Sequence, residues 1–154
     1  QEVNVFDEVG RLINRLKIAG ISVYEINLFS LVIEMLKERG ILDKIIDKEP
    51  DLSKEKLYKT LQGAIDAQKY LIPKIEEINS SNHSNIVFLT GIGQVYPFIR
   101  SHSVLNNLQN SIKDRPTVMF FPGIYDGTSL SLFGKLKDDN YYRAFNLETI
   151  NLVK

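Results

Sequence analysis

Residues Ile86–Asp126 read IVFLTGIGQVYPFIRSHSVLNNLQNSIKDRPTVMFFPGIYD. Two short apolar runs, Ile86–Leu89 and Val118–Phe121, each end in a turn rich in Gly, Pro and Tyr, and one amphipathic helical pattern lies between them. Strands that are covered on both faces lose the alternation of polar and apolar residues, so this pattern predicts a βαβ unit. The turns Thr90–Pro97 and Pro122–Gly127 would then leave the same carboxyl edge of a parallel sheet, where ligands and partners usually meet α/β folds.

The composition limits the class of protein. At 154 residues, the chain is predicted to form a single α/β domain, residues 1–154. Lys plus Arg equals Asp plus Glu at 19 each, so net charge gives no argument for nucleic acid or a membrane surface. The absence of cysteine excludes disulfides and thiolate zinc sites, and the presence of only His83 and His102 argues against a histidine metal cluster. Without a secretory or transmembrane stretch, a cytoplasmic location with no membrane partner is expected.

Hydrophobic periodicity predicts the elements ahead of the βαβ unit. Apolar residues at helical spacing predict an amphipathic helix over about residues 4–18, and β-branched and aromatic residues predict a strand over 21–28, followed by a second helix. Ser53 is predicted to cap a long helix. Because Pro73 lacks a backbone donor, that helix should kink or restart near Leu71.

Three segments give weaker signals. Residues 41–52 break at Pro50 and are expected to be irregular. Residues 130–136 fit neither period, which suggests a short helix or an irregular lid, and Tyr142–Leu147 is predicted to form a strand. Together, these elements predict a three-layer α/β sandwich with a mainly parallel sheet and helices on both faces.

Gly91 and Gly93 follow a predicted buried strand and precede a helix, the position from which backbone N–H groups cradle phosphates. A Rossmann fingerprint needs a third glycine where this chain has Tyr96-Pro97, and a P-loop needs a Gly-Lys-Ser/Thr sequence that is absent here. The fold is therefore expected to be P-loop or Rossmann-like without a Walker A motif. The alternative is that both glycines only permit a tight turn with positive φ.

Arg100, Ser101 and His102 lie near the start of the helix within the βαβ unit. A helix N-terminus, an arginine and a histidine all favour a phosphate or carboxylate. Alternatively, Ser101 or Ser103 caps the helix and His102 donates to a nearby carbonyl. His102, Asp126 and a serine could be drawn as a catalytic triad, but the chain has no Gly-x-Ser-x-Gly nucleophile elbow.

Acidic and aromatic residues near the end of the chain offer two further candidates. Magnesium could bind a group of carboxylates, although turns and helix caps produce the same distribution: Asp126, Asp138, Asp139 and Glu148. Aromatic side chains beside Arg143 could stack on bases or on a protein partner, with strand packing as the alternative: Tyr125, Tyr141, Tyr142 and Phe145.

Three strings resemble the BrxB family of bacterial BREX phage-defence systems: FLTGIGQVYPFIRSHSVLNNLQ, FFPGIYDG and LSLFGKLKDDNYYRAFNL. The upstream string GRLINRLKIAGISVYEINLFSLVIEMLKERGIL is also similar, so the resemblance covers most of the chain. It implies a cytoplasmic component of an anti-phage locus, working beside a large ATPase, a DNA adenine methyltransferase and an alkaline-phosphatase-like protein. It implies no established catalytic residue. Family members usually carry another apolar stretch ahead of Glu2, so an N-terminal strand segment is expected to be missing here.

The family pattern marks motif positions without assigning roles, and these are expected to form a binding or docking surface: Gly91, Gly93, Tyr96, Pro97, Arg100, Ser101, His102, Pro122, Gly123, Tyr125, Asp126, Gly127, Tyr142 and Arg143. Since no catalytic motif is complete, the first hypothesis is a non-enzymatic assembly or adaptor subunit without cofactor or metal. The second is a degenerate nucleotide-binding domain, in which the Gly91–Pro97 turn and Arg100 hold phosphate. Direct DNA contact through Lys135, Lys137 and Arg143 is a third, weaker hypothesis, because no DNA-binding motif is present.

Overall fold

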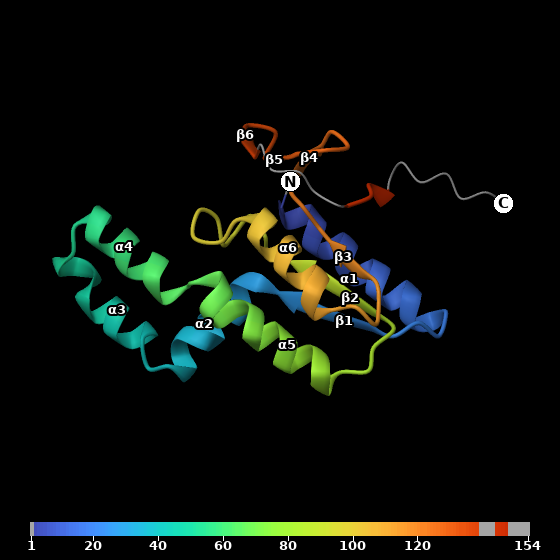
Figure 1. Ribbon diagram of the computed structural model, residues 1–154, viewed down its shortest axis with the longest axis horizontal. Coiled ribbons are helices and arrows are strands. Elements are labelled where there is room, and N and C mark those ends of the chain that lie inside the picture. Colours follow the sequence, from blue (N-terminus) through green and yellow to red (C-terminus); the bar gives the residue numbers. More distant parts are fainter. Residues whose placement is uncertain (1, 139–143, 148–154) are drawn as a thin grey trace.

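The computed structural model describes residues 2–138 and 144–147. Helices and three strands alternate in the first part of the chain, and three further strands follow (Figure 1). The first elements are α1 (Glu2–Ile18), β1 (Val23–Asn27), α2 (Leu28–Glu38), α3 (Leu42–Lys48) and α4 (Lys54–Ala64). A π-helical turn (Ala67–Leu71) leads to α5 (Ile72–Ser81), β2 (Ile86–Thr90), α6 (Ser101–Ser111) and β3 (Thr117–Met119). The last strands are β4 (Gly123–Tyr125), β5 (Leu130–Leu132) and β6 (Leu136–Asp138).

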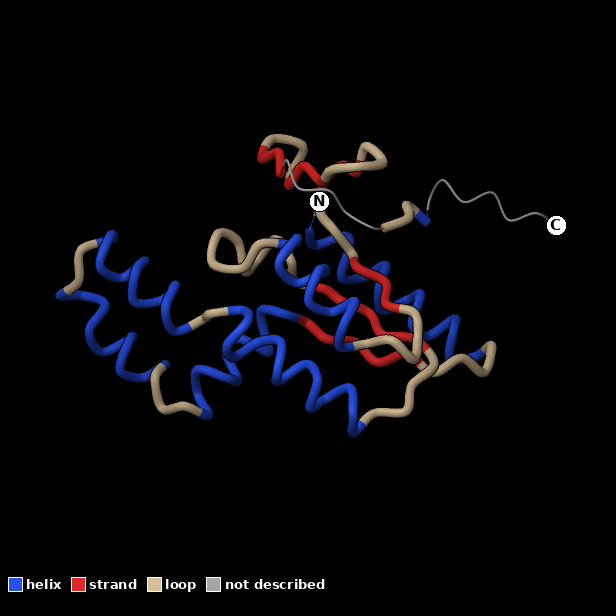
Figure 2. The backbone as a smooth tube through the Cα atoms, viewed as in Figure 1, coloured by secondary structure: helices blue, strands red, loops and turns tan. Residues whose placement is uncertain are grey.

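Strands β1, β2 and β3 form a parallel sheet with β2 in the middle (Figure 2). The register pairs Val23 with Ile86 and Val87 with Thr117. The predicted βαβ unit is therefore confirmed as β2, α6 and β3. The carboxyl ends of parallel strands lie at the same edge of a sheet, so β2 ends at Thr90 and β3 ends at Met119 along one edge.

The two faces of the sheet bury different side chains. Val87 and Leu89 of β2 belong to the main hydrophobic core, together with buried residues of α2, α5 and α6. Side chains alternate along a strand, so Phe88 points to the opposite face, where its ring lies 5.0 Å from that of Phe120. Helix α1, whose Val9 is buried outside the main core, lies on the side of the sheet away from α5 and α6 (Figure 1). The predicted parallel sheet with flanking helices is confirmed, whereas likeness to a P-loop or Rossmann fold stays a prediction.

The helical region between β1 and β2 differs from the expectation in two places. The segment predicted to be irregular contains α3, because Ile41 and Leu42 pack against the main core and stabilise a turn of helix there. The predicted long helix begins after Ser53, which accepts a bond from the Lys56 backbone as expected, but it already ends at Ala64. The chain restarts as α5 at Ile72, close to the predicted position.

The segment after β3 forms a second, antiparallel sheet in the order β4–β5–β6. The prediction of a short helix or irregular lid for residues 130–136 is therefore wrong, and Pro122–Gly127 is not a simple turn because it contains β4. Phe133 and Gly134 have positive φ values of 55° and 68° and reverse the chain between β5 and β6. A three-residue strand carries too weak a pattern to be recognised without its partner. Of the strand predicted at Tyr142–Leu147, residues 144–146 are irregular, Leu147 has 3₁₀-helical conformation, and the rest lies outside the described residues.

Across the described ranges, no helix combines the length and the apolar character needed to cross a membrane.

Candidate functional site

The loop of residues 91–100 joins β2 to α6 at the carboxyl edge of the parallel sheet. It sends three apolar side chains into the main core, those of Ile92, Val95 and Ile99. Its backbone also bonds internally: the Phe98 and Ile99 N–H groups each donate to the Val95 carbonyl at 3.0 Å. The loop is thus held from inside, although it contains no regular strand or helix.

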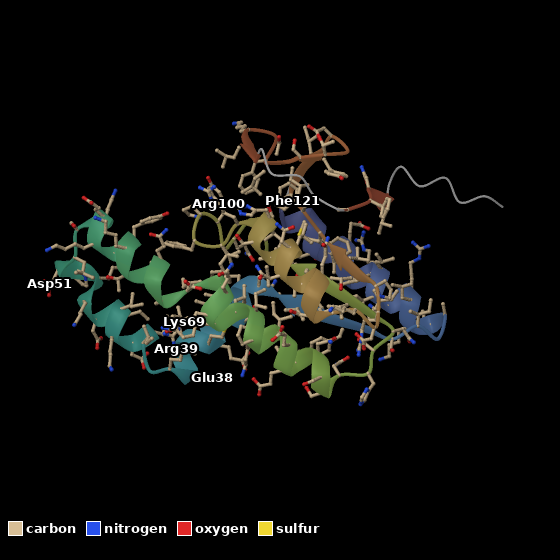
Figure 3. All side chains as sticks on the ribbon, viewed as in Figure 1. Glu38, Arg39, Asp51, Lys69, Arg100 and Phe121 are labelled. Carbon is tan, nitrogen blue, oxygen red and sulfur yellow. The ribbon has the colours of Figure 1, made fainter. Side chains whose placement is uncertain are left out.

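The same loop presents polar and aromatic groups to solvent. Tyr96 is 38% exposed, and Pro97 and Arg100 are also exposed. The peptide between Tyr96 and Pro97 is cis. Figure 3 shows the Arg100 side chain extending outward from the loop ahead of α6. Tyrosine and arginine are the residue types that most often dominate the binding energy of protein interfaces.

Gly91 is explained by its neighbours in the fold. Its φ is +73°, and a Cβ atom added there would lie 2.9 Å from Asn27 Oδ1 and 3.2 Å from the backbone nitrogen of Phe29. Asn27 caps α2 by accepting a bond from the Ser30 N–H at 3.0 Å. Gly91 therefore lets the end of β2 pass close to the start of α2. The expected positive φ holds for Gly91 but not for Gly93, which is half-buried with an ordinary φ.

Polar residues at the start of α6 are arranged differently from the expectation. The N-cap position is Arg100, whose side chain makes no capping bond, so the prediction that Ser101 or Ser103 caps the helix is wrong. His102 and Ser103 are half-buried neighbours, with His102 Nε2 3.2 Å from Ser103 Oγ. Ser101 is half-buried as well.

Asp126 organises its own turn. Its Oδ1 accepts bonds from the N–H groups of Thr128 (2.9 Å) and Ser129 (2.7 Å) and from the Thr128 hydroxyl, and its Oδ2 accepts from the Ser129 hydroxyl. These donors, led by the Ser129 N–H, lower the pKa of the exposed Asp126 carboxyl well below its usual range.

The predicted magnesium group stays untested by the structure. Asp139 and Glu148 lie outside the described residues, as does the side chain of Asp138. Among the described side chains, no group of three or more His, Cys, Asp and Glu residues is placed to hold a metal ion. The predicted basic patch also stays untested. Of its three residues, only Lys135, which is exposed, is described with its side chain.

The remaining site residues of the second sheet serve its construction. The Tyr125 hydroxyl lies within bonding distance of the Gly127 (2.8 Å) and Ala144 (2.9 Å) carbonyls, to which it can donate. A Cβ atom on Gly123 would overlap the Ser131 carbonyl oxygen across the β4–β5 pair. Pro122 accepts a bond from the Phe133 N–H at 2.8 Å, and Gly127 has a φ of +95°. Tyr141, Tyr142 and Arg143 lie outside the described residues.

One contact of the loop has no signal in the sequence. The centroid of the Phe98 ring lies 5.3 Å from that of Tyr58 on α4. Tyr58 is 38% exposed. The two rings are forty positions apart, and neither breaks the pattern of its own segment. The structure therefore brings α4 to the exposed edge of loop 91–100, where Tyr96, Pro97 and Arg100 also lie.

Comparison with known proteins places these residues in a family. The family model described as "BREX protein BrxB" matches residues 24–147. The chain is 42% identical over 130 residues to a BREX protein BrxB of Bacillus cereus (strain H3081.97), covering 84% of this chain and 68% of that protein. It is 35% identical over 122 residues to a BREX protein BrxB of Escherichia coli O9:H4 (strain HS), covering 79% of this chain and 60% of that protein.

No solved structure gave a significant match. The family match includes both sheets and the loop 91–100 between β2 and α6. The chain belongs to the BrxB family, whose proteins are components of bacterial BREX phage-defence systems.

Proposed function

We propose that this chain is a non-enzymatic adaptor subunit of a BREX complex, and that it docks another BREX protein through the exposed face of loop 91–100. The candidate partners are the ATPase, the DNA adenine methyltransferase and the alkaline-phosphatase-like protein that the family resemblance implies, in the bacterial cytoplasm. Loop 91–100 and the start of α6 supply the contacts, and the Pro122–Gly127 segment continues the surface.

The observation that carries this proposal is the combination of a fixed loop with an exposed Tyr-Pro-x-x-Arg edge. Ile92, Val95 and Ile99 anchor the loop in the core, while Tyr96 and Arg100 face solvent. A loop that is already ordered loses little conformational entropy on binding, so more of the contact energy remains as affinity. This arrangement suits a docking surface better than a flexible lid over a reaction centre.

The proposal is tested by co-purification. The tagged chain is expressed in a bacterium that carries the corresponding BREX locus, and the retained BREX proteins are quantified by mass spectrometry. The double variant Tyr96→Ala, Arg100→Ala should retain at least tenfold less of its direct partner, because truncation of a central aromatic or arginine contact typically costs about 2 kcal/mol or more.

The matched control is Arg11→Ala, which removes another exposed arginine, on α1, where it pairs only with Glu8 of its own helix within the described residues. It should leave partner retention unchanged. Wild-type retention by a folded double variant would contradict the assignment of this surface.

A second candidate function is the binding of a nucleotide phosphate at loop 91–97 and Arg100. It is favoured by the start of α6, because a helix N-terminus attracts anions and the side chain of the N-cap residue Arg100 makes no capping bond there. It is disfavoured at Gly91, which Asn27 approaches closely. ATP, GTP or NAD at a hundredfold excess over its dissociation constant would stabilise the fold by about 2.7 kcal/mol and raise the melting temperature. A flat response to all three would remove this candidate.

A further inference from the structure

Helices α3 and α4 form an arm, residues 42–64, that extends away from the parallel sheet at the left of Figure 1. Neither helix contains a buried residue. Its apolar side chains are at most half-buried, and Ile46 is 55% exposed. A segment with few buried contacts opens at a lower free energy than the core to which it is attached.

A two-residue joint separates the arm from the body. Ile65 (φ −109°, ψ 28°) and Asp66 (φ −57°, ψ 118°) leave the helical conformation between α4 and the π-helical turn. The Asp66 side chain accepts a bond from the Lys69 N–H at 2.8 Å and so starts the next helical segment afresh. The backbone hydrogen bonds of α4 therefore do not continue into α5, and the angle between them has to be set by other contacts.

Arg39, at the end of α2, contacts both sides of this joint. Its Nη1 donates to the carbonyl of Ala64, the last residue of α4, at 2.6 Å. Its guanidinium carbon lies 3.6 Å from the ring centroid of Tyr70 in the π-helical turn, which is cation–π geometry. Figure 3 shows Arg39 and Lys69 close to the point where the arm meets the body. The half-buried Arg39 thus ties the arm to the body at its base, beside Leu42, Leu61 and Ala64 of the arm, which pack against the main core.

At its other contact, the arm reaches the loop proposed to dock a partner. Phe98 is half-buried: it packs against the main core on one side, and its ring contacts that of Tyr58 on α4. Phe98 follows Tyr96 and Pro97 directly and precedes Arg100 by two positions. The position of the arm therefore decides how much of this aromatic ring is available at the edge.

We infer that the α3–α4 arm is a hinged element, that Arg39 holds it closed at the joint of residues 65–66, and that the closed arm masks Phe98. The significance of the masking for partner binding rests on the proposed function of loop 91–100; the hinge itself does not. When the arm opens, the ring of Phe98 joins the exposed edge beside Tyr96.

The hinge is tested on the isolated 154-residue chain by hydrogen–deuterium exchange with mass spectrometry. Arg39→Ala removes both the bond to Ala64 and the contact with Tyr70, so exchange of residues 42–64 should accelerate at least tenfold while β2 and α6 keep their wild-type rates. Arg39→Lys keeps the charge but loses the planar group, so an intermediate acceleration is expected. The matched control is Lys69→Ala, which removes the other cation near Tyr70, 5.1 Å from its ring, and should change exchange little.

The masking of Phe98 is tested with a fluorescent reporter. The chain contains no tryptophan, so Phe98→Trp introduces a single one. Its acrylamide quenching constant should rise about twofold when Arg39→Ala is added, because the indole is then no longer covered by Tyr58. Unchanged exchange in residues 42–64 after Arg39→Ala would overturn the hinge. An equal acceleration throughout the chain would also overturn it, since Arg39 would then stabilise the whole fold. Both readouts need no partner, so they stand or fall separately from the docking proposal.

Discussion

At the scale of single residues, the candidate site separates into side chains that face solvent and side chains that build their own segment. Tyr96 and Arg100 are exposed on an anchored loop. Tyr125 and Asp126 bond to nearby backbone and hydroxyl groups. Motif positions of one family can therefore have different physical causes, and a substitution at Asp126 changes the stability of its turn as well as the surface that the turn presents.

The pH dependence of stability should report the turn at Asp126. The carboxylate is stabilised by donors from Thr128 and Ser129, which hold its pKa below the usual range in the folded state. A depressed folded-state pKa contributes stability above the unfolded-state pKa of about 4, and this contribution is lost as the pH falls toward the folded-state value. Asp126→Asn should therefore lose less stability than the wild type between pH 7 and pH 3, as measured by urea unfolding midpoints.

Asp43→Asn controls for the loss of one acidic group, because Asp43 is exposed in the first turn of α3 and makes no comparable set of bonds within the described residues. If Asp126→Asn and wild type show the same change in midpoint between the two pH values, the turn does not couple to folding as the geometry requires.

At the scale of elements, the carboxyl edge is assembled where the end of β2 meets the start of α2. The N-cap residue Asn27 is also the last residue of β1 and pairs with Thr90 across the sheet. At the next residue, Gly91, an added Cβ atom would lie 2.9 Å from Asn27 Oδ1. One asparagine thus ends a strand, starts a helix and limits the residue that can follow β2.

Gly91→Ala should destabilise the fold by about 2 kcal/mol or more. The left-handed conformation alone costs an L-residue about 1–2 kcal/mol, and the new methyl group must also displace Asn27. Gly10→Ala is the control, since Gly10 lies within α1 with open space where the new methyl group would stand, and it should stabilise the helix by about 0.5–1 kcal/mol. Chemical denaturation compares the two variants; equal effects would contradict the close approach at Gly91.

At the scale of the whole molecule, the described part of the chain builds two separate sheets. Ile26, Val87 and Leu89 of the parallel sheet belong to the main core, whereas the buried Leu130 and Leu132 of β5 lie outside it. Phe121 packs against the main core just before the chain enters β4. The second sheet therefore follows directly on the end of β3, and its buried leucines are not part of the main core.

Gly123→Ala should destabilise the second sheet without destabilising the parallel sheet. Its methyl group overlaps the Ser131 carbonyl and so breaks the β4–β5 pairing. Hydrogen exchange of residues 123–138 should accelerate strongly, while that of β2 keeps its wild-type rate. A parallel loss of protection in β2 would mean that the two sheets unfold as one unit.

Local signals explain which parts of the fold were predictable. Ser53 was predicted to cap a helix and does so, because capping involves residues only three positions apart. The apolar run of β2 was also predicted correctly, since a strand covered on both faces has to be apolar throughout. In the same way, the exposed residues of loop 91–100 could be proposed as a site from their position between a strand and a helix.

The sequence by itself thus determined the parallel βαβ unit, the helix within it and the loop that leaves its carboxyl edge, because each depends on periodicity or on neighbours along the chain. Only the tertiary structure decided the second sheet, the helix α3 and the contacts Arg39–Tyr70 and Tyr58–Phe98. These features join residues that are far apart in the chain or strands of three residues, and their stability comes from the partner rather than from the local pattern.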